Sequence, residues 1–149
     1  EFVISTNPGE PERSLGQVAS GGELSRIMLA IKTVLADSDD IPTLIFDEID
    51  TGISGRTAQK VAEKLAVISR NHQVICITHL PQIASMADCH FEIKKSTDGE
   101  STKTRILRLN EKDTVTELAR LLGGAQITEA VLQNASEMKK LAEQTKKRR

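Results

Sequence analysis

Apolar side chains at helical spacing predict the first long helix. Between Ser20 and Pro42 they fall at steps of three and four residues: Leu24, Ile27, Met28, Ile31, Val34 and Leu35. Such steps place them on one face of a helix. Ser20 precedes this stretch and Glu23 follows Ser20 by three residues, which is the pattern of a capping box. We therefore expect a helix that begins after Ser20 and ends at the polar run 37–40.

The same spacing, together with helix breakers, predicts four further helices. Their expected positions are a stretch through Val61, Leu65 and Ile68, a short helix from Pro81 to about Ala87, and two closing helices near 113–122 and 128–146, which Gly123-Gly124 separates.

Short uninterrupted apolar runs predict strands that are buried on both faces. Residues 44–46 end abruptly at Asp47-Glu48, and residues 74–77 end at Thr78-His79, as buried parallel strands do. Weaker strand signals lie at 2–5, which the breakers at 7–11 end, and at 91–93 and 106–109, joined around the hairpin signal Asp98-Gly99. The expected fold class is α/β: a mainly parallel sheet with flanking helices, then a hairpin and two helices, with a site along the carboxyl edge of the sheet.

The composition excludes several classes of function. The 149 residues and 16.3 kDa suit one domain, 1–149. A net charge of −1 excludes a chain that is basic throughout, and three Phe without Tyr or Trp are too few for a base-stacking platform. Two cysteines fit a reducing cytoplasm, and no apolar run approaches the ~18 residues of a membrane span.

The small net charge conceals two regions of opposite sign. Residues 1–50 carry ten acidic and three basic side chains, whereas the last eleven residues carry six basic side chains and one acidic one. The basic tail continues a predicted helix. It is therefore either a solvated helix end or a contact for nucleic acid or another partner.

The pair Asp47-Glu48 is the first candidate site. In open α/β sheets ligands bind at the carboxyl ends of the strands. One acid there can hold Mg²⁺ together with substrate phosphates, and its neighbour can orient or deprotonate a water. The alternative is that strands often end in an acid for solubility alone.

The run Ser20-Gly21-Gly22-Glu23 is the second candidate. Glycines at a helix N-terminus let an anion approach the free N–H groups, and the helix dipole favours phosphate. The alternative is a loop in which glycine only permits a tight turn.

His79 is the third candidate, because a histidine just past a buried strand can bind a phosphate oxygen. The alternative is a histidine that satisfies a local backbone group. His72 and His90 have no comparable setting and are expected on the surface. Cys76, with His79, Cys89 and His90, has no spacing typical of a zinc site, since Cys76 lies within an apolar strand.

Taken together, these motifs resemble a known family. Ser20–Arg26, Thr43–Glu48, Asp50-Thr51-Gly52 and Ile77–His79 are similar, in that order, to the signature loop, Walker B strand, D-loop and switch histidine of the C-terminal half of an ABC-type ATPase head. Glu23, where transporter ATPases usually have Gln, points to the chromosome-maintenance (SMC) branch. The fuller strings at 20–30, 46–55 and 78–84 resemble the RecN family of bacterial double-strand-break repair proteins.

The resemblance implies a role for each motif residue. Asp47 would help to hold Mg²⁺, Glu48 would act on the attacking water, and His79 would contact the γ-phosphate of ATP. Asp50 would couple two sites across a dimer of heads. Ser20, Gly21 and Gly22, with Glu23 beside them, would clasp the γ-phosphate bound to the second head.

One expected motif is missing, and the resemblance also implies partners. No Gly is followed by Lys anywhere in the chain, so the P-loop is absent. In the family it lies in an N-terminal half, beyond a coiled coil. The chain also begins at Glu1 within a strand-like run, so we expect part of a longer protein. Its partners would be that N-terminal half, a second head and DNA, in the bacterial cytoplasm near the nucleoid.

Two alternatives remain open at this level. One is a head fragment of another SMC-like cohesion or condensation ATPase, although the string 50–55 argues against it. The other is a non-catalytic module that binds DNA or a partner through its basic tail.

Overall fold

A computed structural model describes residues 2–5, 8–18, 20–35, 40–98, 101–124 and 126–147. Its strands are β1 (Val3–Ile4), β2 (Arg13–Ser14), β3 (Thr43–Phe46), β4 (Gln73–Cys76), β5 (Phe91–Asp98) and β6 (Ser101–Arg108). Its helices are α1 (Leu15–Val18), α2 (Gly21–Val34), α3 (Gly55–Ile68), α4 (Pro81–Ala84), α5 (Glu111–Gly123) and α6 (Glu129–Lys147). The predicted helix end at 37–39 and the hairpin turn at Gly99 lie outside the described residues.

The helix predictions are confirmed for α2, α3, α5 and α6, with small shifts at their ends. At α2 both bonds of the predicted capping box form between Ser20 and Glu23. Pro81 occupies the first turn of α4, as expected, but that helix ends three residues earlier than predicted, at Ala84.

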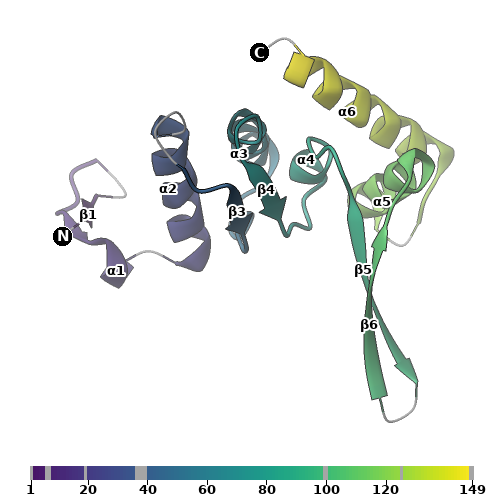
Figure 1. The fold of residues 1–149 in the computed structure, drawn as a ribbon, viewed down its shortest axis with the longest axis horizontal. Coiled ribbons are helices and arrows are strands. Elements are labelled where there is room, and N and C mark those ends of the chain that lie inside the picture. The colour runs from purple at the N-terminus through teal and green to yellow at the C-terminus, as the bar shows by residue number, and fades with distance from the viewer. Residues whose placement is uncertain are drawn as a thin grey trace.

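The strands form three separate pairs, so the expectation of a mainly parallel sheet is only partly right. β3 and β4 pair in parallel, whereas β1–β2 and β5–β6 are antiparallel. Within the part of the chain that the structure describes, parallel pairing is confined to β3 and β4. The molecule is therefore a mixed α/β fold, with the hairpin β5–β6 projecting from its body (Figure 1).

The parallel pair is buried on one face only, which corrects the prediction of fully buried strands. Leu44 and Phe46 point into the main core, which α2, α3, α4 and α6 also build. The alternate residues Ile45, Ile75 and Ile77 remain 68%, 45% and 50% exposed. Because successive side chains on a strand point to opposite faces, one sheet face is apolar and uncovered.

Two histidines expected on the surface are instead packed against the backbone. His72 is 7% exposed, and its Nδ1 lies 2.7 Å from the carbonyl oxygen of Ile41. His90 is half-buried, with Nε2 2.8 Å from the carbonyl of Ala84, and burial lowers its pKa. The His72 ring joins segments that are 31 residues apart, whereas the His90 ring bonds a carbonyl only six residues before it.

The basic tail is a packed helix over its described length, and two of its four described lysines contact the rest of the fold. Lys139 Nζ donates to the carbonyls of Ser85 (3.2 Å) and Ala87 (2.7 Å), just past α4. Lys146 Nζ lies 2.5 Å from Asp88 Oδ1. Among the described helices, none is long and apolar enough to cross a membrane.

Candidate functional site

The candidate residues converge because β3 and β4 run parallel and in register. Phe46 pairs with Cys76, and the amide of Ile77 donates to the carbonyl of Phe46 at 3.0 Å. The chain therefore leaves both strands at one edge, where Asp47-Glu48 and Thr78-His79 follow.

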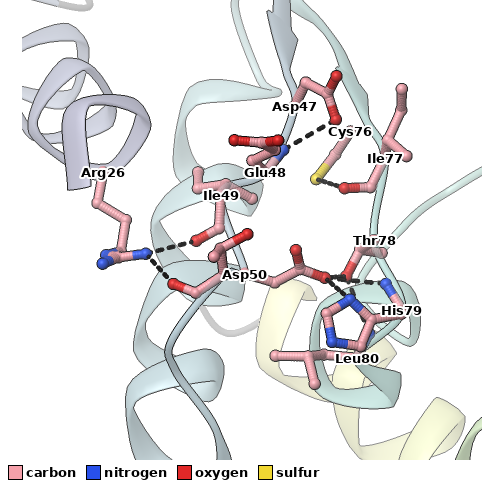
Figure 2. Close-up of polar contacts among 11 residues, drawn as sticks. Arg26, Asp47, Glu48, Ile49, Asp50, Cys76, Ile77, Thr78, His79 and Leu80 are labelled. Carbon is pink, nitrogen blue, oxygen red and sulfur yellow. Dashed lines mark hydrogen bonds and ion pairs between the residues drawn. The ribbon is translucent and has the colours of Figure 1, made fainter. Parts of the chain in front are cut away.

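The Asp47-Glu48 pair is exposed and conformationally unusual. Glu48 has φ 56°, the left-handed region that residues other than glycine rarely adopt, and it alone among the described non-glycine residues does so. Its amide donates to Asp47 Oδ1 at 2.9 Å (Figure 2). A strained backbone conformation of this kind persists only where the surrounding structure holds it in place. Such conformations are common in functional loops.

The two glycines of the signature run pack against this same loop. A Cβ added at Gly21 would lie 2.6 Å from Glu48 Oε2, and one at Gly22 would lie 2.8 Å from the Glu48 carbonyl oxygen. Glycine is thus required at Gly22 for the close approach of α2 to the backbone of the loop after β3, whereas at Gly21 the flexible Glu48 side chain can give way. The Glu48 carboxylate consequently lies beside the N-terminus of α2.

Ser20 and Glu23 satisfy that helix terminus. Ser20 Oγ accepts from the Glu23 amide (3.4 Å), and the Ser20 amide donates to Glu23 Oε2 (2.8 Å). The backbone hydrogen bond from Ser20 holds the pKa of Glu23 below its usual value. Glu23 therefore acts as a cap in this chain, while Ser20 stays exposed.

Ser25 and Arg26 are contacts that the sequence reasoning missed. Ser25 Oγ donates to the carbonyl of Asp47 at 2.9 Å. Arg26 Nη1 donates to the carbonyls of Ile49 (3.1 Å) and Thr51 (2.8 Å), as Figure 2 shows. These bonds fasten α2 to the loop after β3. Their only sequence signal is that both residues end the string Ser20–Arg26 that resembles the signature loop.

Asp50 is buried and bound within its own chain. It is 5% exposed, its Oδ2 accepts hydrogen bonds from Thr78 Oγ1 (2.6 Å) and the His79 amide (2.9 Å), and the same oxygen lies 2.9 Å from His79 Nδ1 as an ion-pair contact. Burial raises the pKa of Asp50, but the hydrogen bonds from Thr78 and His79 and the nearby imidazole outweigh it, so the net pKa is lowered. Within this chain Asp50 therefore links the loop after β3 to Thr78 and His79, and its expected role in coupling two sites across a dimer stays a prediction.

His79 is held at one nitrogen and open at the other. Its side chain is 73% exposed although Nδ1 bonds Asp50. Figure 2 shows the ring beside Asp50, on the segment that follows β4. Because a carboxylate only accepts, Nδ1 carries the hydrogen, and Nε2 is left for an outside ligand.

The cysteine within β4 has a different character. Burial, and then the charges of Asp50 and Asp47, raise the pKa of Cys76 to about 12. Its thiol therefore stays protonated near neutral pH and is a poor metal ligand. Within the described ranges, no three His, Cys, Asp or Glu side chains are grouped to hold a metal by themselves.

The donor set nevertheless fits a magnesium–phosphate ligand. Mg²⁺ takes one or two carboxylates and completes its shell with waters and substrate phosphates. Glu48 supplies an exposed carboxylate beside the N-terminus of α2, Asp47 supplies another on the same loop, and His79 supplies an exposed imidazole after the neighbouring strand. This edge can therefore receive a phosphate-bearing ligand together with a divalent cation.

Comparison with known proteins finds relatives that match nearly the whole of this chain, although the chain spans only part of each relative. No protein-family model matches the chain. DNA repair protein RecN of Bacillus subtilis (strain 168) is 49% identical over 146 residues, covering 98% of this chain and 25% of that protein. DNA repair protein RecN of Treponema pallidum (strain Nichols) is 51% identical over 138 residues, covering 93% and 24%. The chain thus spans about a quarter of the length of these relatives.

A solved structure gives an independent likeness in three dimensions. It comes from work titled "Structural biochemistry of ATP-driven dimerization and DNA stimulated activation of SMC ATPases". It superimposes with a TM-score of 0.52 at 20% identity, over 83% of this chain and 81% of the solved one. At this identity the likeness shows a shared fold. The chain is therefore homologous to the C-terminal quarter of the RecN DNA repair proteins and shares its fold with a chain of the SMC ATPases.

Proposed function

We propose that the chain is the C-terminal lobe of an ATPase head of the RecN type, in a bacterial cytoplasmic protein that acts near the nucleoid. In the intact protein, ATP bound between two heads would clamp them together, and hydrolysis would release them during recombinational repair of double-strand breaks. The observation that carries the proposal is the meeting of Asp47-Glu48, His79 and the glycine-rich start of α2 at one strand edge.

Three residues would serve the nucleotide bound to their own head. Asp47 would hold Mg²⁺, which would supply charge neutralisation of the phosphates. Glu48 would accept a proton from the attacking water. His79 would present Nε2 to the γ-phosphate, while its Nδ1 faces Asp50.

The start of α2 would serve the second head. Ser20, Gly21 and Gly22 would meet the γ-phosphate of the nucleotide on that head, where the N–H groups and the helix dipole favour an anion. Movement of α2 would reach the catalytic loop of the same chain through Arg26, whose two bonds end on that loop. We assign this coupling within the chain to Arg26 and Ser25, while Asp50 would couple the two sites across the dimer.

The missing P-loop would come from the N-terminal half of the same head. That half would cover the apolar sheet face at Ile45, Ile75 and Ile77, which are all at least 45% exposed. Covering such a face removes apolar surface from water and so favours association. Alone, the chain is expected not to hydrolyse ATP.

The rival reading as a binding module on its basic tail is less well supported, because Lys139 and Lys146 are engaged within the fold. The rival reading as another SMC-like ATPase is less well supported too, because the RecN relatives are about half identical over nearly the whole chain.

The decisive experiment adds the N-terminal half in trans. ATP turnover is expected with the wild-type chain and an at least ~100-fold loss with Glu48→Gln, the range for removal of a general base. Glu12→Gln is the matched control, since Glu12 is exposed and lies outside the site. Steady ATP turnover by the chain without the N-terminal half, or full activity of Glu48→Gln with that half, would contradict the proposal.

A further inference from the structure

The β5–β6 hairpin is the most extended part of the described chain. Each strand has eight residues, and the register runs without interruption from Phe91 opposite Arg108 to Asp98 opposite Ser101. At about 3.3 Å per residue each strand is roughly 26 Å long. Figure 1 shows the hairpin projecting from the body beside α5.

Cationic side chains line this hairpin, and all of them are exposed: Lys94, Lys95, Lys103, Arg105 and Arg108. Lys94 forms an ion pair with Glu92 at 3.0 Å. The other four have no hydrogen bond or ion pair to any described residue. Lys139 and Lys146 of the tail hold parts of the fold together, whereas the side chains of these four hairpin cations do not.

Their placement opposes the hairpin's own stability. Lys94 lies directly opposite Arg105, and Lys103 follows two residues along the same face, because Ser96 is its partner. Like charges directly opposite each other on adjacent strands are destabilising. Lys95 and Arg108 stand on the other face. An anionic polymer would relieve this repulsion, whereas a single small anion would reach only one end of the row.

We propose that the β5–β6 hairpin binds the phosphate backbone of duplex DNA, with Lys103 and Arg105 as its principal contacts. The choice of DNA as the polyanion rests on the proposed function. A two-stranded β-ribbon fits the major groove, whose two walls are lined by phosphates, and this hairpin carries cations on both faces. Cations on phosphates position a protein without reading sequence, so binding should be independent of sequence and sensitive to salt.

The test measures fluorescence anisotropy of a labelled duplex of mixed sequence, without nucleotide, over a salt series. The variant is Lys103→Gln/Arg105→Gln. Two matched variants also remove two exposed charges each: Lys60→Gln/Lys64→Gln on α3 and Lys140→Gln/Lys147→Gln on α6. A charge-keeping variant, Lys103→Arg/Arg105→Lys, completes the set, and equal urea midpoints establish equal folding.

Loss of two phosphate contacts is expected to make the negative slope of log K, the logarithm of the binding constant, against log salt shallower by about 1.8. Binding should also weaken at least about tenfold. The α3, α6 and charge-keeping variants should bind within about twofold of wild type. The proposal is overturned if the hairpin variant binds as the α3 variant does, if the α6 variant loses as much, or if the wild-type chain shows no salt-dependent binding. Because no nucleotide is present, these outcomes are independent of the ATPase test.

Discussion

The loop after β3 is rich in acidic side chains and the C-terminal half of α6 is rich in lysines, and each region uses some of these charges internally and leaves others exposed. In the loop, Asp50 is 5% exposed and bound to His79, while Asp47 and Glu48 are exposed. In the helix, Lys139 bonds two backbone carbonyls, while Lys140 is exposed.

The two regions differ in what the internal charge achieves. Asp50 fixes an imidazole whose other nitrogen faces outward, so it prepares a neighbouring group for a ligand. Lys139 binds two backbone carbonyls, so its charge only fastens α6 to the segment that follows α4. A buried charge therefore indicates function when its partner is itself exposed and reactive, and architecture when its partner is backbone.

One large expected effect on stability concerns the approach of α2 to the loop after β3. In Gly22→Ala the new Cβ would meet the backbone oxygen of Glu48 at 2.8 Å, so α2 must move. The gain in helix propensity of about 0.5–1 kcal/mol offsets part of an overpacking cost of about 1–3 kcal/mol. A lower urea midpoint is expected.

Gly21→Ala is the matched control for that prediction. Its Cβ would meet only the mobile end of the Glu48 side chain, at 2.6 Å. Stability should be nearly unchanged, while turnover restored by the N-terminal half should fall because the carboxylate is displaced. Equal midpoints for both alanine variants would refute the packing assigned to Gly22.

The next effect separates Asp50 from its exposed neighbour Glu48. Asp50→Ala leaves the Thr78 hydroxyl and the His79 amide without their acceptor, which costs about 1–3 kcal/mol of unfolding free energy. Glu48→Gln should change it by less than about 0.5 kcal/mol, as exposed substitutions do. Chemical denaturation compares them, and equal losses would remove the distinction between the two carboxylates.

The pH dependence of stability sharpens the same contrast. The pKa of Asp50 in the folded chain lies below its ordinary value of 3.8, so the unfolded chain binds this proton more readily. Asp50 therefore contributes stability above pH 3.8 that is lost as pH falls through the folded value. Asp50→Asn should flatten this acid limb of the urea midpoint against pH. An unchanged limb would show that other carboxylates produce it.

The smallest expected effect concerns the tail. Lys139→Ala removes two charge-assisted bonds, and because burial and Lys146 already lower the pKa of Lys139, we expect a net loss of only about 1 kcal/mol. Lys140→Ala, on the exposed side, should be neutral within about 0.5 kcal/mol. Thermal denaturation measures both, and a stable Lys139→Ala variant would show that apolar packing alone holds α6.

Much of the local structure could be predicted from the sequence. Features that depend on near neighbours in sequence could be predicted from short stretches of it. They are the capping box at Ser20, the proline start of α4 and the β5–β6 hairpin. The order of motifs also pointed to the ATPase head, and the RecN relatives confirm that resemblance.

Only the tertiary structure decided the roles of several side chains. The bonds from Thr78 and His79 to Asp50 could not be predicted, and His72 was expected on the surface but is buried. The contacts of Arg26 had no signal beyond its place at the end of the string Ser20–Arg26. Each case depends on contacts between residues more than 20 positions apart, which a parallel crossover brings together and no local pattern encodes.

The sequence by itself determined the elements, their order and the types of chemical group at the strand edge, because these follow from short-range periodicity and residue chemistry. The tertiary structure decided which face of β3–β4 is covered, which charges are internal and which remain for ligands. The physical reason is that burial and partner choice are set by packing between distant segments. An apolar run such as 44–46 is compatible with one covered face or two until its neighbours are in place.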